Sequence, residues 1–265
     1  LYEAKMFHQF DHRWSTYDGN RARDVLPEEK EDPDFVVTPR YWVDEEHVRA
    51  RIPGDWRYRW LLVFRKIARV TDERTVIASL IPAVAVGDSA PIVFPSVSPH
   101  YTAVLLACLN TMVLDYIARQ KVGGTNLNFF LAEQFPVLPP ASFEAVDLEF
   151  IVPRVLKLVY TSKDLEPFAR DLGFSGQPFK WDADARARIR AELDAYFALL
   201  YGLTKEEIRY ILDPQDVYGP DYPGETFRVL KENERRTYGE YRTKRLVLEA
   251  YERLAPSFRK RHQTA

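Results

Sequence analysis

Arginine side chains interleaved with aromatic ones between residues 56 and 74 form the first pattern that could do chemistry. A guanidinium group pairs with phosphates, and it can bridge two acceptors on the edge of a guanine. The arginines are Arg57, Arg59, Arg65, Arg69 and Arg74, and the aromatic residues are Trp56, Tyr58 and Trp60. This combination favours a surface that binds duplex DNA, although arginines on a strand can also simply lay their stems over a sheet.

A glycine pair followed by two small polar residues forms a second candidate for binding a phosphate backbone. The residues are Gly123, Gly124, Thr125 and Asn126. Glycine lets another backbone approach closely, and the side chains of Thr125 and Asn126 can donate hydrogen bonds. The alternative is a tight turn between a helix and a strand, and the two roles are compatible.

Motifs for catalysis are absent from the sequence or are better explained in other ways. The sequence has no glycine-rich nucleotide-binding motif, no G-x-S-x-G motif, and no D-P-P-Y or N-P-P-Y motif for a flipped base. His8 and His12 have the spacing of a helical metal pair, but their segment is typical of a strand. Cys108 lies on an apolar helical face, where a buried thiol is the usual finding.

Composition narrows the class of protein. The 265 residues carry a net charge of −2, and the single cysteine excludes a disulfide-stabilised scaffold and favours a reducing compartment. No apolar run approaches the roughly 18 residues of a membrane span, and the N-terminal residues lack the features of a signal peptide. We therefore expect a cytoplasmic protein with no membrane partner. Because the chain starts at Leu1, we also expect a piece of a longer protein.

The near-neutral total hides an uneven distribution of charge. Residues 49–75 contain eight basic and three acidic side chains, and residues 226–262 contain eleven basic and five acidic ones. Blocks of like charge are often no more than solvated faces. The first block coincides with the interleaved arginines, so the balanced total does not exclude nucleic acid as a partner.

Hydrophobic periodicity predicts an α+β fold. Alternating or almost wholly apolar segments indicate strands over residues 1–17, 56–70, 75–87 and 91–97, and the second of these would carry Arg57, Arg59, Arg65 and Arg69 on one face. The polar segment 18–34 predicts a loop, and residues 101–120 predict one buried helix followed by extended chain. Beyond residue 141 the periodicity is mainly helical, with an N-cap at Asp182, a capping box from Thr204 to Glu207 and a break near Gly239. We predict a β-rich domain with a buried helix over residues 1–140 and a mainly helical region over residues 141–265.

Several segments resemble, in the same order, a family of large prokaryotic restriction-modification methyltransferases. The N-terminal LYEAKMFHQFDHRW is similar to the segment that follows the catalytic domain in that family. The further segments are RYWVDEEHV, FRKIARVTDERTVIASLIP, LLACLNTMVLDYIARQKVGGTNLNFFLAEQFPVLPP, RAELDAYFALLYGLTKEEIRYILDP and PGETFRVLKENERRTYGEYRTKRLVLEA. The helix with LN, the GTNL turn and the strand closing on LPP also resemble target recognition domains of TaqI-like methylases and type I specificity subunits. The resemblance omits only residues 18–34 and about 143–176.

The resemblance implies a target recognition domain and helical C-terminal region of an adenine-specific DNA methyltransferase, from a restriction-modification or phage-defence system. Its partners would be double-stranded DNA and an upstream methyltransferase domain in the same parent chain. The pockets for S-adenosylmethionine and for the flipped base would lie in that upstream domain. This chain alone would then bind no cofactor and would contain no catalytic residue.

The resemblance also implies which residues contact DNA. Arg65, Arg69 and Arg74 come first, followed by Arg57 and Arg59. Lys121 would join Gly123, Gly124, Thr125 and Asn126 at the DNA backbone, with Asn126 also able to reach a groove edge. His8, Gln9, His12 and Arg13 would reach bases or tie the entry strand to the sheet. Basic residues of the helical tail would hold the far side of the DNA or pack on the upstream domain, namely Arg235, Arg236, Arg242, Lys244 and Arg245.

Two alternatives from other classes remain open. In the first, the chain is a protein-interaction scaffold that docks a methyltransferase or restriction partner subunit, and its arginines pair with its own acidic residues, such as Asp72 and Glu73. In the second and more remote one, the chain is a nuclease that uses Asp18, Glu28 and Lys30, although such spacing arises readily by chance in a charged loop.

Overall fold

The computed structural model describes residues 1–262, with side chains to residue 260. The chain divides into two units, each built from three separate segments of sequence. The first unit comprises Leu1–Ile67, Ile77–Leu109 and Val137–Trp181. The second comprises Ala68–Val76, Asn110–Pro136 and the described chain from Asp182 onward. The division expected near residue 141 therefore falls inside a segment of the first unit.

A three-stranded antiparallel sheet lies in the first unit. Strands β3 (Trp60–Phe64), β4 (Ala78–Pro82) and β5 (Ile92–Val93) take the order β4-β3-β5. Every residue of β3 is buried, because chain packs against both faces of this central strand of aromatic and branched residues. The strand predicted over residues 56–70 is thus much shorter, and the arginines expected on one of its faces all lie outside it.

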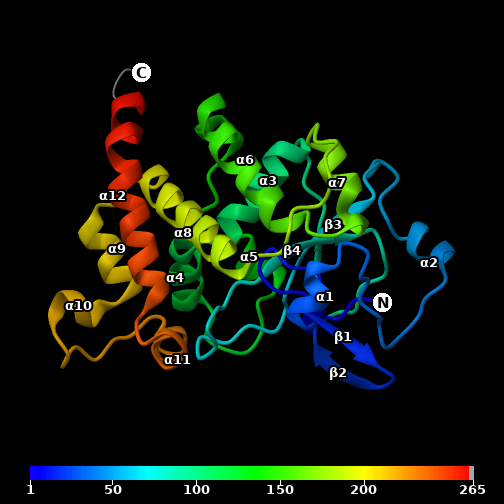
Figure 1. Ribbon diagram of the computed structural model, residues 1–265, viewed down its shortest axis with the longest axis horizontal. Coiled ribbons are helices and arrows are strands. Elements are labelled where there is room, and N and C mark those ends of the chain that lie inside the picture. The colour runs from blue at the N-terminus through cyan, green and yellow to red at the C-terminus, as the bar shows by residue number, and fades with distance from the viewer. Residues whose placement is uncertain (263–265) are drawn as a thin grey trace. The chain divides into compact units, whose positions relative to one another are not determined.

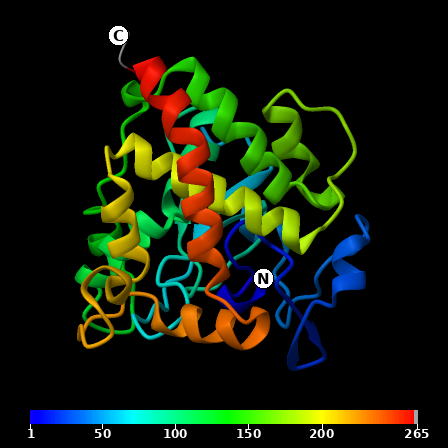
Figure 2. The ribbon, with the colours of Figure 1, turned by 60° about the vertical axis from the view of Figure 1, so that its left-hand side comes forward.

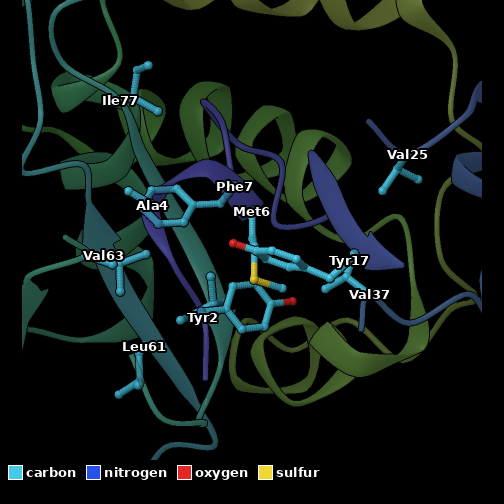
Figure 3. Close-up of a cluster of buried hydrophobic side chains, with 12 residues drawn as sticks. Tyr2, Ala4, Met6, Phe7, Tyr17, Val25, Val37, Leu61, Val63 and Ile77 are labelled. Atoms are coloured by element: carbon cyan, nitrogen blue, oxygen red, sulfur yellow. The ribbon is translucent and has the colours of Figure 1, made fainter. Parts of the chain in front are cut away.

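The N-terminal residues pack against one face of this sheet. Figure 3 shows the side chains of Tyr2, Met6 and Phe7 in one cluster with Leu61 and Val63 of β3. All of these side chains are buried. The chain start therefore contributes to the core of the first unit.

The strand predicted over residues 1–17 is wrong for most of its length. The chain forms a 3-10 helix, η1 (Ala4–Met6), and then a turn in which His8 and Asp11 pair their backbones. Within this turn Phe10 has a φ of 59°, a left-handed conformation that is rare for an aromatic residue. Alternation of residue types cannot reveal such a reversal of the chain.

The loop predicted over residues 18–34 is mostly regular structure. Strands β1 (Ser15–Asp18) and β2 (Arg21–Asp24) form a hairpin, and helix α1 (Pro27–Glu31) follows. Gly19 has a φ of 56°, which a two-residue hairpin turn requires at its first position. The polar sequence misled the prediction because both sides of β2 are exposed.

The remaining elements of the first unit are helices. They are α2 (Glu45–Arg49), α3 (Pro99–Leu109), α6 (Ala145–Val159) and α7 (Glu166–Asp171), with the 3-10 helices η2 (Pro140–Ser142) and η3 (Lys163–Leu165). Helices α3 and α6 pack side by side, as Figure 1 shows. Cys108 is buried on α3, as its apolar surroundings predict.

The second unit is helical. Its elements are α4 (Met112–Lys121), α5 (Phe129–Ala132), α8 (Ala183–Leu200), α9 (Lys205–Leu212), α10 (Pro214–Tyr218), α11 (Arg228–Tyr238) and α12 (Arg242–His262). Helices α8 and α12 pack against each other, and Figure 2 shows them crossing. The fold as a whole is α+β, as predicted.

Local sequence signals place the ends of several helices correctly. The Asp182 side chain accepts a hydrogen bond from the N–H of Ala185, and Thr204 and Glu207 form the predicted capping box. Gly239 ends α11 with a φ of 76°.

Two helix predictions need correction. The single helix expected over residues 101–120 is α3 and α4, because Thr111 caps the start of a new helix at Met112. Extended chain expected after residue 121 is interrupted by α5. No single helix in the described chain is long and apolar enough to cross a membrane. Helices α3 and α4 have the required length and composition only when they are counted together.

Candidate nucleic-acid interface

The second unit brings two of the predicted DNA-binding segments together. The N–H of Ala68 donates to the carbonyl oxygen of Thr125 over 3.0 Å, so the segment that begins Ala68–Arg69 runs beside the glycine-rich loop. Six residues of these two segments are exposed to solvent, namely Arg69, Lys121, Gly123, Gly124, Thr125 and Asn126. We call these six residues the basic loop surface.

The glycines of the basic loop surface are not required by the fold. A Cβ atom added to Gly123 or Gly124 would meet nothing within 4 Å, and neither residue has a left-handed backbone. Gly239, in contrast, has the positive φ that makes glycine the usual residue at a helix end. Open space therefore surrounds the bare backbone at Gly123 and Gly124.

A buried carboxylate fixes the segment that carries Arg69. Asp115 Oδ1 accepts hydrogen bonds from the N–H groups of Thr75 and Val76, over 2.8 and 2.7 Å. Asp115 Oδ2 lies 3.2 Å from Nε of Arg74 and 3.4 Å from Nε of Arg119. Because Asp115 has no exposed surface, these four partners supply the compensation that a buried charge needs.

Arg119 holds the other end of the same segment. Its guanidinium group donates to the carbonyl oxygens of Val70, Asp72 and Glu73 over 2.6 to 2.9 Å. It also donates to the carbonyl oxygen of Thr226 over 2.9 Å. Arg119 was not among the residues predicted for the site. The signal was present, since Asp115 and Arg119 lie four residues apart on an otherwise largely apolar helix.

The expectation that Arg74 contacts DNA needs correction. Its side chain is buried, and Nη2 donates to the carbonyl oxygen of Asn110 over 2.6 Å. Together with its ion pair to Asp115, this places Arg74 in the interior of the second unit. Arg74 thus supports the segment that carries Arg69 instead of extending the exposed surface.

Arg57 and Arg59 lie on the surface of the first unit. Both side chains are exposed, and the guanidinium carbon of Arg57 lies 5.6 Å from the centre of the Tyr58 ring. Neither forms an ion pair within the described residues. Arg65 differs, because its Nε donates to the carbonyl oxygen of Phe7 over 3.0 Å and so ties the chain just after β3 to the N-terminal segment.

The residues expected to reach bases from the N-terminal segment are largely interior. Gln9, His12 and Arg13 are buried, and His8 is half-buried with its ring centre 4.5 Å from that of Trp14. Nε2 of His12 lies 2.8 Å from Oδ1 of Asp164, which accounts for its burial. His12 and Arg13 thus tie the entry segment to residues 161–164 of the first unit.

Arg13 organises the first unit through backbone oxygens. Nη1 donates to the carbonyl oxygen of Asp32 over 2.7 Å, and Nη2 donates to those of Lys30 and Thr161 over 2.8 and 3.0 Å. Its own N–H donates to Oδ1 of Asp11 over 2.9 Å. A planar fork with several donors suits this task, because it reaches carbonyl groups in different directions at once.

The residues of the remote nuclease alternative do not form an accessible set. Nζ of Lys30 is buried and lies 2.7 Å from Oδ2 of Asp11. The rings of Trp14 and Trp181 flank the same ammonium group, with centres 4.7 and 4.4 Å away. Lys30 therefore has a structural role in the interior. The residues that the structure describes contain no group of side chains that could hold a metal ion.

The basic tail is partly neutralised by its own acidic neighbours. Arg242 pairs with Asp184, Lys244 pairs with Asp213, and Arg245 pairs with Glu240 and Glu249. Arg235 and Arg236 on α11 are exposed and, among the residues that the structure describes, form no ion pair. Only these two of the five named tail residues present free charge.

A second buried carboxylate supports the start of α4. Oδ1 of Asp194 accepts the N–H of Met112 over 2.7 Å. Burial raises the pKa of the Asp194 carboxyl from 3.8 to about 6, and Arg74 opposes this shift only in part. Asp194 is thus ionised at neutral pH in surroundings that disfavour its charge.

Asp194→Asn is expected to remove a pH dependence of stability. The folded state binds the Asp194 proton more tightly than the unfolded state, so the free energy of unfolding falls as the pH rises from about 4 to about 6. Asparagine keeps the oxygen that accepts from Met112 and has no proton to lose. Relative to wild type, the variant should gain up to about 3 kcal/mol across this range. Urea unfolding at each pH measures the difference, and parallel curves for the two proteins would contradict it.

Comparison of the chain with protein-family models, with curated proteins and with solved structures finds no match.

Proposed function

We propose that this chain is the DNA-recognition part of a prokaryotic adenine-specific DNA methyltransferase, of the restriction-modification or phage-defence type. The resemblance of its segments to that family supports the parent enzyme. The exposed basic loop surface supports DNA as the ligand. The single observation that carries the proposal is the hydrogen bond from Ala68 to Thr125, which joins the arginine segment to a glycine-rich loop that the fold itself does not require.

The proposed mechanism divides the work between this chain and an upstream catalytic domain. That domain, which would bind S-adenosylmethionine, must extrude an adenine from the duplex at a cost of a few kcal/mol. This chain would offset the cost by binding the flanking duplex. Arg69 and Lys121 would neutralise phosphates, Gly123 and Gly124 would admit the DNA backbone, and Asn126 would donate to a groove edge.

The scaffold alternative receives less support from the pairing of charges. It expects the arginines to pair with Asp72 and Glu73. Among the described residues neither carboxylate forms an ion pair, and the side chain of Glu73 accepts from Asn233. Arg69 forms no ion pair with any described residue, so its charge is available to an outside anion.

We expect the chain to bind duplex DNA with a steep dependence on salt. Each neutralised phosphate contributes a log–log slope of roughly −0.9. Arg69→Ala should therefore lower the magnitude of the slope by about 0.9. Gly124→Ala should weaken binding with little change in slope, because it blocks close approach without removing a charge. Fluorescence anisotropy with a labelled duplex at several salt concentrations measures both quantities.

The matched control is Arg188→Ala, which removes an exposed cation from α8 of the same unit. It should leave affinity and slope close to those of wild type. Thermal unfolding should show Gly124→Ala as stable as wild type, since the added Cβ meets open space. Absence of DNA binding at low salt would refute the proposed function, and equal effects of Arg69→Ala and Arg188→Ala would remove Arg69 from the site.

A further inference from the structure

An exposed aromatic ring lies close in sequence to the basic loop surface. Phe130, on the short helix α5, leaves 74% of its surface exposed, and the neighbouring Phe129 is 51% exposed. The residues between them and the glycine pair are mainly polar, and Thr125, Asn126 and Asn128 are all exposed. An apolar ring is thus presented to solvent within a segment that otherwise offers hydroxyl, amide and bare backbone groups.

The backbone that carries Phe130 is held in place. The carbonyl oxygen of Asn128 accepts the N–H groups of Leu131 and Ala132, each over 3.0 Å. The side-chain amide of Gln134 donates to the carbonyl oxygen of Phe130 over 2.9 Å. The ring therefore projects from a hydrogen-bonded turn and not from an irregular loop, which lowers the entropy that a ligand must remove on binding.

The same turn is connected to a cation of the basic loop surface. Nζ of Lys121 lies 3.5 Å from Oε1 of Gln134, the residue that also binds the backbone of Phe130. The side chain of Gln134 thereby links the ammonium group of Lys121 to the backbone that carries the Phe130 ring. This pairing is what nucleic-acid surfaces use when a cation follows the phosphates and a ring stacks on a base.

We propose that this surface takes DNA whose base stack is open, and that Phe130 stacks on the base that borders the opening. The inference rests on the proposed DNA-recognition function and deepens it. An intact duplex covers the faces of its bases, whereas a duplex from which a base has been extruded leaves two faces uncovered. Stacking on an uncovered face stabilises the open duplex, and it works for any base because every base has a π-face.

The test compares two labelled duplexes of the same length and sequence, one intact and one with a tetrahydrofuran abasic site at its centre. The full chain of 265 residues is used throughout. Wild type should bind the abasic duplex more tightly. Phe130→Ala should weaken binding to the abasic duplex by about 5- to 150-fold, the loss expected for one stacked base, and should change binding to the intact duplex little. Phe130→Trp should retain the preference.

A second readout is specific to stacking. With 2-aminopurine placed beside the abasic site, wild type and Phe130→Trp should quench its fluorescence, and Phe130→Ala should not. The matched control is Trp42→Ala, which removes another highly exposed aromatic ring, at 78% exposure, from the first unit. It should behave as wild type with both duplexes.

The outcomes separate this inference from the proposed function. The stacking role would be overturned, and DNA recognition left intact, by either of two results. In the first, wild type binds both duplexes equally well; in the second, Phe130→Ala retains the preference and the quenching. Equal weakening of both duplexes by Phe130→Ala would also overturn it, because it would indicate a general contact. No binding of either duplex at low salt would overturn both proposals.

Discussion

Asp115→Asn should destabilise the protein by about 3–5 kcal/mol, the range measured when one partner of a buried ion pair is removed. The substitution keeps the shape of the side chain, and Oδ1 can still accept from Thr75 and Val76. It replaces Oδ2 by an amide group that points at the guanidinium groups of Arg74 and Arg119, so two buried or nearly buried cations lose their counter-charge. Urea unfolding followed by circular dichroism measures the change in free energy.

The same substitution should also weaken DNA binding under conditions where the chain remains folded. Asp115 fixes the segment that carries Arg69, and loosening of this segment leaves the exposed cation without a defined position. Asp72→Asn is the matched control, because it removes an exposed carboxylate from the same segment. The control should change stability by no more than about 0.5 kcal/mol. A similarly small effect of Asp115→Asn would show that the buried carboxylate is not needed to hold the segment.

Arg13→Met is expected to be as damaging in the first unit, with a loss of about 3–5 kcal/mol, because each buried acceptor left without a partner costs roughly 1–3 kcal/mol. Methionine fills much of the same volume but leaves the carbonyl oxygens of Lys30, Asp32 and Thr161 without their donor. Unsatisfied buried acceptors carry their full desolvation penalty, which is larger than the net gain from forming a hydrogen bond. Thermal and urea unfolding measure the loss.

Two further variants separate the charge of Arg13 from the geometry of its guanidinium group. Arg13→Lys keeps the positive charge but cannot reach the three carbonyl groups together, so it should recover only part of the lost stability. Arg21→Met, an exposed arginine on β2, is the control and should leave stability nearly unchanged. If Arg13→Lys were as stable as wild type, charge alone would account for the role of Arg13, and the argument from its fork geometry would be wrong.

The features that the sequence predicted correctly depend on neighbours in the chain. The Asp182 cap, the Thr204–Glu207 box and the stop at Gly239 each rest on contacts within a few residues, so the pattern contains all the information needed. The burial of Arg13 depends on Asp32 and Thr161, which are 19 and 148 residues away. An arginine looks the same in a sequence whether it faces water or carbonyl groups.

In the candidate site, too, some features could be predicted from neighbouring residues and others depend on distant contacts. Arg69 and residues 123–126 were predicted as separate DNA-binding segments, and their chemistry is legible from residue types alone. Their adjacency follows from one backbone hydrogen bond between Ala68 and Thr125, which no periodicity reveals. Arg74 is grouped with Arg69 in the prediction because both belong to the basic block at residues 49–75. The strand ends at Phe64, and Arg74 instead meets a carboxylate on α4.

The alternation of segments between the two units bears on how a gene for such a protein can change by recombination. Each unit is assembled from three stretches of chain, so a single crossover within residues 68–181 exchanges parts of both units and leaves neither intact. The stretch Asn110–Pro136 is different, because it carries both α4 and the glycine-rich loop. A double crossover at its ends would transfer the loop together with Asp115 and Arg119, which hold the neighbouring Arg69 segment in place.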